Sequence, residues 1–387
     1  MENFKTYFGL WWFADDPENR FQAVLTVVNG TANLCYFGKF QQLSFHLSSD
    51  IGNIFGLATD LETHDDYSFK LYSLYESKRS NATLSKIILS TKLFLIGKPN
   101  RKENSSQFKS LHLTSYLWKF WLNKSGFKAD VSPMENKQFA YEVQYNRPEK
   151  VTLFQDDNLT IKVFFRAGLS NTTDDQKLLT EDPILTTNFT KNLELKSISK
   201  YREQLERFLM ILWEDVHLFS ITEVVSVDNT VFTVFDNRRS FGRRSRFAVK
   251  NEDFIENFEK WFSSWLFISK KYEYPINTFF FALTGHSMDI HSEFLSFTFG
   301  LERFHKQLIG SSAKLSQGIA ALISRLDSDA KQKYEDLDLL GIEKTRHYLV
   351  HLDEKHKSYV IPSQKLAWVN DTLIELMFKL LKTVMIK

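Results

Sequence analysis

The chain has 387 residues, a formal net charge of +2, 43% hydrophobic residues and 15% aromatic residues. This length and apolar content predict two folded domains or one large one, and argue against wholesale disorder. Because the charges nearly balance, the composition does not indicate a nucleic-acid-binding protein, and a basic surface for such a partner has to be local.

The cysteine content and the N-terminus predict a cytoplasmic protein. The only cysteine, Cys35, cannot form an intrachain disulfide, which favours a reducing compartment and excludes cysteine-rich zinc sites. The segment MENFKTYFGLWWF lacks the basic start and apolar run of a signal peptide. No uninterrupted apolar run approaches the length of a membrane span, so we expect no membrane contact.

Residues 1–250 are predicted to form a β-rich domain. Residues 21–28 and a second run ending at Phe37 are rich in β-branched and aromatic residues, and Asn29-Gly30 between them predicts a hairpin. Polar loops separate further short runs, which predict an antiparallel sandwich-like or curled sheet. These runs lie at 67–75, 86–96, 107–121, 139–145, 151–154 and 159–166.

A helix and a strand pair are predicted near the end of this domain. Tyr201, Leu205, Phe208 and Leu212 recur at helical spacing and predict a helix over about 199–213. Strands are expected next, at 217–226 and 230–236.

An arginine-rich stretch, RRSFGRRSR, follows the strand pair. One interpretation is a solvated loop tip, and the other is an RNA-binding patch that contacts phosphates and stacks Phe241 on a base. Its arginines are Arg238, Arg239, Arg243, Arg244 and Arg246.

Residues 251–387 are predicted to form a helical bundle. Apolar residues recur every three or four positions over 254–268, 294–308 and 315–326, and again from Leu366 to Leu380. Gly341 is expected to break the chain before the next-to-last helix, and Ser363 to cap the last one. The predicted fold class is therefore α+β, an N-terminal antiparallel β-sandwich-like domain followed by a helical bundle.

The next-to-last helix carries RHYLVH, residues 346–351. On a helix Arg346 and His351 are separated by roughly 140° and about 7.5 Å of rise, so both can line one cleft without stacking on each other. An arginine forks two donors toward a phosphate, and a histidine moves protons near neutral pH. Arg346, His347 and His351 thus suit the cleavage of a phosphodiester that supplies its own nucleophile.

The C-terminal third resembles the HEPN superfamily (higher eukaryotes and prokaryotes nucleotide-binding), which is marked by an arginine, a polar residue and a histidine four to six positions after the arginine. RHYLVH fits the shortest spacing, near the expected start of its helix. The segment FLSFTFGLERFHK (294–306) is similar to a helix of the ApeA-like HEPN group, although Gly300 stands where alanine is more common.

The N-terminal half is similar to the β-rich domain that precedes HEPN in ApeA proteins. The features that carry this similarity are Gly9, Trp11, Trp12, Pro17, the hairpin over 21–37, Trp118, Trp121 and LFQDDNLTIKV at 153–163.

The resemblance implies a metal-independent endoribonuclease of bacterial anti-phage defence, acting by abortive infection without a cofactor. The ribose 2′-OH attacks the phosphorus and leaves 2′,3′-cyclic phosphate and 5′-OH ends. His351 would act as general base or acid and Arg346 would offset the developing charge, with His347 as a further phosphate or proton group. Glu302 is expected to orient His351 or pair Arg346, or else to be a surface carboxylate.

The resemblance also implies a homodimer through the bundle, because one chain supplies only one Arg/His set. RNA is the expected substrate, with tRNA, rRNA and mRNA all open. A phage-encoded trigger is expected to act on the β domain.

Several alternatives stay open at this stage. His347 and His351 have metal-ligand spacing, with Asp353 or His356 as a third ligand. The bundle can bind RNA or a nucleotide without cutting it, and a basic helix end can simply complement the helix dipole. A toxin silenced by nucleotidyl transfer would need a tyrosine at position 353, where this chain has Asp353. A sugar site in the β domain would use Trp11, Trp12, Trp118 and Trp121.

Overall fold

The computed structural model describes residues 4–38, 52–80, 85–99, 105–115, 125–133, 139–173, 176–214, 216, 219, 221–236, 251–284, 288–310 and 312–386. The chain divides into two compact units, which we call the β unit (Met1–Arg202 and Phe219–Arg239) and the helical unit (Glu203–Leu218 and Ser240–Lys387). The division falls inside helix α2 (Leu195–Trp213), whereas the sequence placed that helix within a β-rich domain ending at residue 250.

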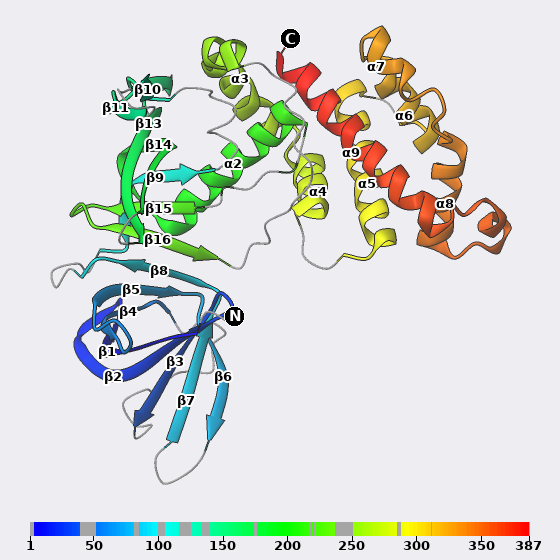
Figure 1. Ribbon diagram of the computed structural model, residues 1–387. Coiled ribbons are helices and arrows are strands. Elements are labelled where there is room, and N and C mark those ends of the chain that lie inside the picture. Colours follow the sequence, from blue (N-terminus) through cyan, green and yellow to red (C-terminus); the bar gives the residue numbers. More distant parts are fainter. Residues whose placement is uncertain are drawn as a thin grey trace. The chain divides into compact units, whose positions relative to one another are not determined.

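The β unit is built from antiparallel strands (Figure 1). They are β1 (Lys5–Phe13), β2 (Asp16–Val28), β3 (Thr31–Gly38), β4 (Ile54–Asp60), β5 (Asp66–Tyr72), β6 (Tyr75–Ser80), β7 (Ser85–Thr91), β8 (Leu93–Gly97), β9 (Gln107–Thr114), β10 (Phe127–Pro133), β11 (Phe139–Tyr145), β12 (Val151–Gln155), β13 (Leu159–Thr173), β14 (Gln176–Glu194), β15 (Ile221–Ser226) and β16 (Val231–Asp236).

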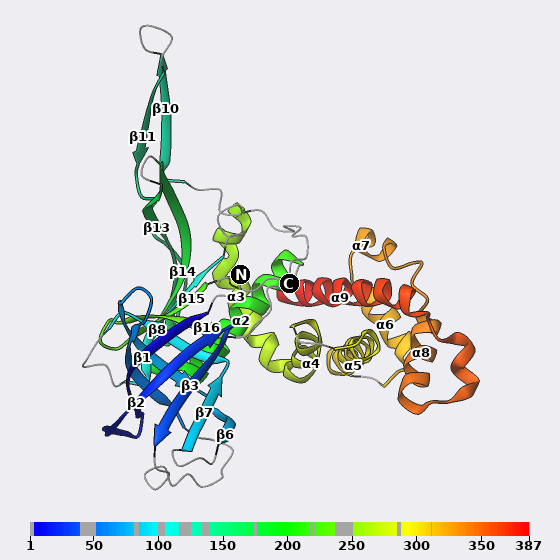
Figure 2. The same ribbon diagram turned by 60° about the horizontal axis from the view of Figure 1, so that its bottom comes forward.

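Fourteen of these strands form one continuous sheet, in the order β12-β13-β14-β9-β15-β16-β8-β5-β4-β1-β2-β3-β7-β6. Every neighbouring pair of strands in this sheet is antiparallel, which confirms the predicted strand orientation. The sandwich-like prediction differs from this arrangement, because β16 hydrogen-bonds to β8 and joins the two parts of the sheet without a break. β10 and β11 form a separate hairpin, seen above β13 in Figure 2.

The hairpin predicted around Asn29-Gly30 is confirmed. Val28 pairs with Thr31, and the two turn residues have φ values of 48° and 73°. Positive φ at both positions is typical of a tight type I′ turn, which matches the twist of the flanking strands.

Strands β1 to β5, together with β7 and β8, surround a common aromatic and aliphatic core. Trp11 is fully buried and donates its indole N–H to Ala23 O, and Trp12 is 3% exposed. These two residues are therefore core residues and cannot present their faces to a sugar. Trp118 and Trp121 lie outside the described residues.

β14 is a long strand that the sequence analysis did not predict. Its sequence contains Pro183 and several charged residues, which are uncommon inside strands. Pro183 pairs with Phe165 of β13, while the pairing of β14 with β9 begins one residue later, at Ile184. The proline therefore lies just before the doubly paired part of β14, where a missing N–H costs no ladder bond to β9.

The helical unit contains the second part of α2 and the helices after residue 250. These are α3 (Asn251–Lys271), α4 (Glu273–Thr284), α5 (Ile290–Ile309), α6 (Leu315–Ile323), α7 (Ser328–Gln332), α8 (Leu339–His351), the 3-10 helix η2 (Glu354–Tyr359) and α9 (Ser363–Ile386). No helix of the described residues has the length and apolarity that crossing a membrane requires.

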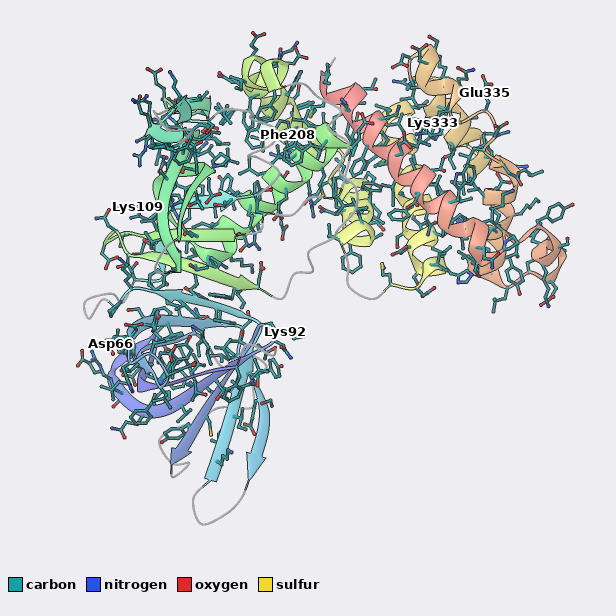
Figure 3. All side chains as sticks on the ribbon, in the orientation of Figure 1. Asp66, Lys92, Lys109, Phe208, Lys333 and Glu335 are labelled. Atoms are coloured by element: carbon teal, nitrogen blue, oxygen red, sulfur yellow. The ribbon has the colours of Figure 1, made fainter. Side chains whose placement is uncertain are left out.

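The predicted apolar stripes form the core of this unit. On α9 the buried positions include Leu366, Val369, Leu373, Leu376 and Leu380, as expected from their spacing. At the other end of the unit, Phe208 of α2 packs edge-on against Phe258 and Phe262 of α3. Figure 3 labels Phe208 in this position.

Two predicted helix boundaries are wrong by one or two residues. Gly341 does not break the chain but lies in the first turn of α8, where its N–H donates to the N-cap carboxylate of Asp338 at 2.8 Å. Ser363 is the first residue of α9, and the carbonyl of Pro362 accepts the N–H of Leu366. At Gly341 a side-chain cap starts the helix before the glycine, and at Ser363 a backbone hydrogen bond starts it at the residue expected to be the cap.

Gly300 lies in the interior of α5, and an alanine fits there. A Cβ at this position meets no atom closer than Pro275 O at 3.5 Å. Because glycine costs a helix interior about 0.5–1 kcal/mol relative to alanine, we expect Gly300→Ala to stabilise the helical unit by that amount. Thermal unfolding followed by far-UV circular dichroism measures the change.

Gly56 provides the opposite control for this substitution. A Cβ there would lie 2.2 Å from Cε3 of the buried Trp11 ring, so Gly56→Ala should destabilise the β unit by about 1–3 kcal/mol. Shifts of the same sign in the two variants would contradict this account.

Candidate active site

RHYLVH occupies the C-terminal end of α8, not the start of that helix as predicted. Asp338 caps the N-terminus, and the helix ends when Leu352 adopts a left-handed conformation with φ 53° and ψ 33°. The N–H of Leu352 donates to Tyr348 O at 2.7 Å. The chain then turns back through η2, so residues after the motif return to the last turns of α8.

Thr345 holds this returning segment against α8. Its buried hydroxyl oxygen accepts the N–H of Ile361 at 3.0 Å and lies 3.4 Å from Tyr359 O, to which it donates. Because Thr345 precedes Arg346 directly, the same turn of α8 positions the motif arginine and anchors the end of η2.

Arg346 is held between two residues of α5. Its Nη2 donates to Glu302 Oε2 at 3.0 Å, and its guanidinium carbon lies 4.9 Å from the centre of the Phe299 ring. The Nε atom is buried without a hydrogen-bond partner among the described residues. The side chain is 22% exposed, so the guanidinium is fixed in direction and still reached by solvent.

Two further imidazoles lie close to the ring of His347, the residue after this arginine. The ring centre of His347 is 4.7 Å from that of His351 and 4.8 Å from that of His356. His351 is exposed at the end of α8, whereas the side chain of His356 is only 11% exposed. The structure thus places His347 between an exposed histidine of the motif and a shielded histidine of η2.

A small cavity of about 270 Å³ opens next to these residues. It brings together Glu302, Arg346 and His347, which the sequence analysis singled out, whereas His351 does not line it. The other charged or ionisable residues that line it are Lys314, Glu343, Lys344 and His356. The cavity is therefore mixed in charge, with the motif arginine at one wall.

The ionisation of two neighbouring residues is shifted by their surroundings. The Lys355 ammonium, 2.7 Å away, is the main cause that lowers the pKa of Asp353 below its usual range. Burial lowers the pKa of His356, and the nearby Lys344 charge lowers it further. At neutral pH Asp353 is therefore ionised and His356 is an uncharged imidazole.

Asp353 and His356 were expected only as alternative third ligands of a metal site with His347 and His351, and the structure places both of them beside His347. Asp353 Oδ2 lies 3.6 Å from His347 Nε2 and 3.9 Å from His356 Nε2. His347 and His356 are nine residues apart, and the left-handed turn at Leu352 lies between them. Helical periodicity in the sequence therefore could not predict that the two rings are neighbours.

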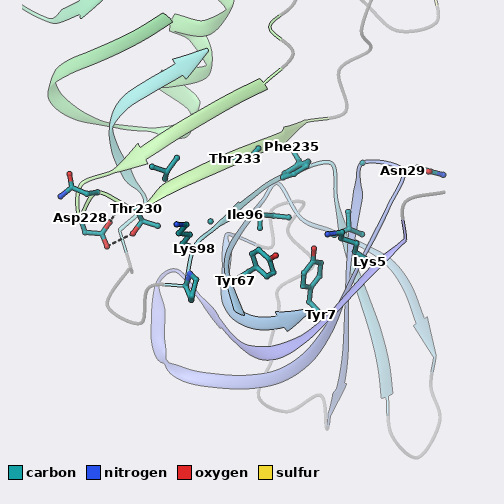
Figure 4. A pocket seen from close by; sticks show the side chains of 16 residues that line it. Lys5, Tyr7, Asn29, Tyr67, Ile96, Lys98, Asp228, Thr230, Thr233 and Phe235 are labelled. Atoms are coloured by element: carbon teal, nitrogen blue, oxygen red, sulfur yellow. Dashed lines mark hydrogen bonds between the residues drawn. The ribbon is translucent and has the colours of Figure 1, made fainter. Parts of the chain in front are cut away.

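The five arginines from Arg238 to Arg246 lie outside the described residues, so their proposed contact with RNA stays a prediction. The β unit contains a separate and larger cavity of about 1140 Å³. Tyr7, Tyr67, Ile96 and Phe235 line it together with Lys5 and Lys98 (Figure 4). Burial and the charge of Asp60 raise the pKa of Tyr7 to about 12, so its phenol stays protonated.

Comparison with known proteins identifies one family. Residues 6–265 match the family model described as ApeA N-terminal domain 1. The match covers the β unit, α2 and most of α3, and it ends before α5 and α8. No curated protein and no solved structure matches the chain.

The anchoring role of Thr345 leads to a testable expectation. Thr345→Val leaves the buried N–H of Ile361 without its acceptor, which should cost about 1–3 kcal/mol and loosen η2. Hydrogen exchange of residues 353–361 should accelerate while exchange in α5 stays unchanged.

Thr298→Val is the matched control, because Thr298 is equally buried and its hydroxyl donates only to carbonyls of its own helix. If both variants leave η2 equally protected, Thr345 does not anchor it.

Proposed function

Because the chain belongs to the ApeA N-terminal domain 1 family, we propose that it acts in bacterial anti-phage defence and that its helical unit is a HEPN ribonuclease. Family membership supports the defence role. The ribonuclease activity is supported by one observation above all, the placement of Arg346 and His347 at a common cavity with Glu302 beside the guanidinium.

The proposed reaction is an intramolecular transesterification. The ribose 2′-OH attacks the adjacent phosphorus, the bond to the 5′-oxygen breaks, and the products carry a 2′,3′-cyclic phosphate and a 5′-OH. One histidine removes the proton from the 2′-OH and another returns a proton to the leaving oxygen. This chemistry needs RNA and no metal ion, since the substrate supplies the nucleophile.

Arg346 binds the non-bridging phosphate oxygens and offsets the charge that develops on them. In the absence of RNA, Glu302 accepts a hydrogen bond from the Arg346 guanidinium. The Phe299 ring packs against the guanidinium and keeps it in place. The pair is partly exposed on both sides, so it contributes only about 0.2–1 kcal/mol and an arriving phosphate can replace Glu302. Glu302 is therefore assigned a positioning role.

His351 is the proposed general base or acid, and His347 is the second imidazole. His351 is exposed, and Val350 and Leu352 beside it are also exposed although apolar. Leu340, Tyr359 and Trp368 are further large exposed apolar residues of α8, η2 and α9. Such exposed apolar residues on the motif helix and its neighbours support a homodimer in which a second chain supplies a second Arg/His set to the same RNA.

The β unit is the proposed sensor, and a phage component is the proposed trigger. Its cavity combines aromatic walls with charged side chains of both signs, Lys5, Lys98 and Asp228, which suits a ligand with both apolar and polar groups. Helix α2 begins in the β unit and ends in the helical unit.

Arg346→Ala should lower RNA cleavage by about a hundredfold to a thousandfold, because it removes the group that offsets the transition-state charge. Arg346→Lys should recover only part of the activity, since an ammonium cannot form the bidentate contact. The assay uses purified protein and single-stranded RNA in EDTA, with the product ends mapped chemically and the same sequence with 2′-deoxyriboses as the uncleavable control.

Arg303→Ala is the protein control, because Arg303 is the next residue on α5 after Glu302 and does not line the cavity. The proposal is wrong if Arg346→Ala cuts RNA like the parent protein or if the 2′-deoxy strand is cut. RNA binding without any cleavage by the parent protein would favour a non-catalytic binding module.

A further inference from the structure

We propose that His347, Asp353 and His356 form a binding site for Zn²⁺ or a chemically similar divalent transition-metal ion, and that an ion bound there holds the ribonuclease idle. The evidence for the binding site is the arrangement of its three ligand residues, which is independent of the proposed function. The inhibitory effect rests on the proposed function, because it acts through His347.

The ligand atoms of these three residues all lie within 4.8 Å of one another. Asp353 Oδ2 is 3.6 Å from His347 Nε2 and 3.9 Å from His356 Nε2. In a tetrahedral site with bonds of about 2.0–2.1 Å the ligand atoms are about 3.3–3.4 Å apart. Small side-chain rotations therefore close the set around an ion, and a water or phosphate oxygen can complete the coordination.

The backbone brings the ligands together from two elements. His347 belongs to α8, and His356 belongs to η2, which returns to α8 after the left-handed turn at Leu352. The hydrogen bonds of Thr345 to Tyr359 and Ile361 hold the far end of η2. Because both elements are fixed before an ion arrives, binding requires little ordering of the chain.

The chemistry of the donors also selects the ion. Two imidazoles and one carboxylate are preferred by Zn²⁺ and related transition metals over Mg²⁺ or Ca²⁺, which favour oxygen ligands. His356 is shielded from solvent, and its Nδ1 is buried with no hydrogen-bond partner within the described part of the chain. This ring is held by packing in a position where its Nε2 faces Asp353.

Several cations of the described residues lie near the site, and Lys314 is one of them on the cavity wall. Arg346 is paired with Glu302, so its charge is largely offset. Lys355 contacts Asp353 at 2.7 Å, but its side chain is 70% exposed and can move into solvent when an ion replaces it. Lys344 faces the same cavity as His356 and is the cation that opposes binding most directly.

An ion in this site would take His347 out of the ribonuclease mechanism. A ligated imidazole neither accepts a proton nor donates one from the ligating nitrogen. The ion would also clamp η2 to α8, beside the wall of the cavity that holds Arg346.

The first experiment measures binding without RNA. Titration of the parent protein with Zn²⁺ by calorimetry, and with Co²⁺ by visible absorption, should reveal one high-affinity site with the spectrum of a tetrahedral ion. His356→Ala and Asp353→Asn should each weaken binding by about tenfold or more.

Two histidine controls distinguish this site from adventitious binding. His351→Ala should leave affinity unchanged within about twofold, because His351 lies outside the ligand set although its ring is next to His347. His291→Ala should do the same, since His291 and Asp289 form a pair at the same 3.6 Å separation without a third ligand in the described residues. Equal affinity in all four variants, or no binding by the parent, overturns the site.

The second experiment measures RNA cleavage with and without Zn²⁺, each variant relative to its own rate in EDTA. Zn²⁺ should inhibit the parent protein, and His356→Ala should need about tenfold more Zn²⁺ for the same inhibition. Metal binding without any cleavage in EDTA would refute the proposed function and leave the site intact. Cleavage that Zn²⁺ does not inhibit, although the ion binds, would refute the inhibitory effect.

Discussion

The surroundings of His347 depend on one reversal of the backbone, at Leu352. This residue ends α8 in the left-handed region, which costs a non-glycine residue about 1–2 kcal/mol. The hydrogen bonds that Thr345 makes with Tyr359 and Ile361 offset that cost, since they need the chain to return along α8. Without the reversal, Asp353 and His356 would lie beyond the helix end, and His347 would have neither of them as a neighbour.

The second constraint is the contact between α5 and α8. Phe299 and Glu302 of α5 both contact the Arg346 guanidinium, one through its ring and the other through its carboxylate. Gly300 lies between these two residues in the sequence. Partial exposure keeps this ion pair weak, whereas the core positions on the same helices are buried. The result is a rigid scaffold that carries one exchangeable polar contact, which is the combination that a phosphate-binding arginine requires.

The β unit obeys a different constraint, the continuity of its hydrogen-bonded sheet. β15 and β16 come after α2 in the chain and yet pair between β9 and β8, so residues 221–236 connect strands that were formed much earlier in the sequence. The chain therefore leaves the β unit within α2, returns for one hairpin and leaves again. The family match from residue 6 to residue 265 spans both parts of the β unit and the α2 segment between them.

The sequence by itself determined the local features of this protein. Asn29-Gly30 specified its hairpin through positive φ, and apolar residues at three-four spacing specified the buried stripes of α5 and α9, because both signals act between residues close in the chain. Arg346, His347 and Glu302 were also identified from sequence, and the structure brings them to one cavity. Only the tertiary structure decided that His351 lies outside this cavity and that Asp353 and His356 lie beside His347. It also decided that β16 pairs with β8, since long-range strand pairing and a left-handed turn at a leucine leave no periodic trace in the sequence.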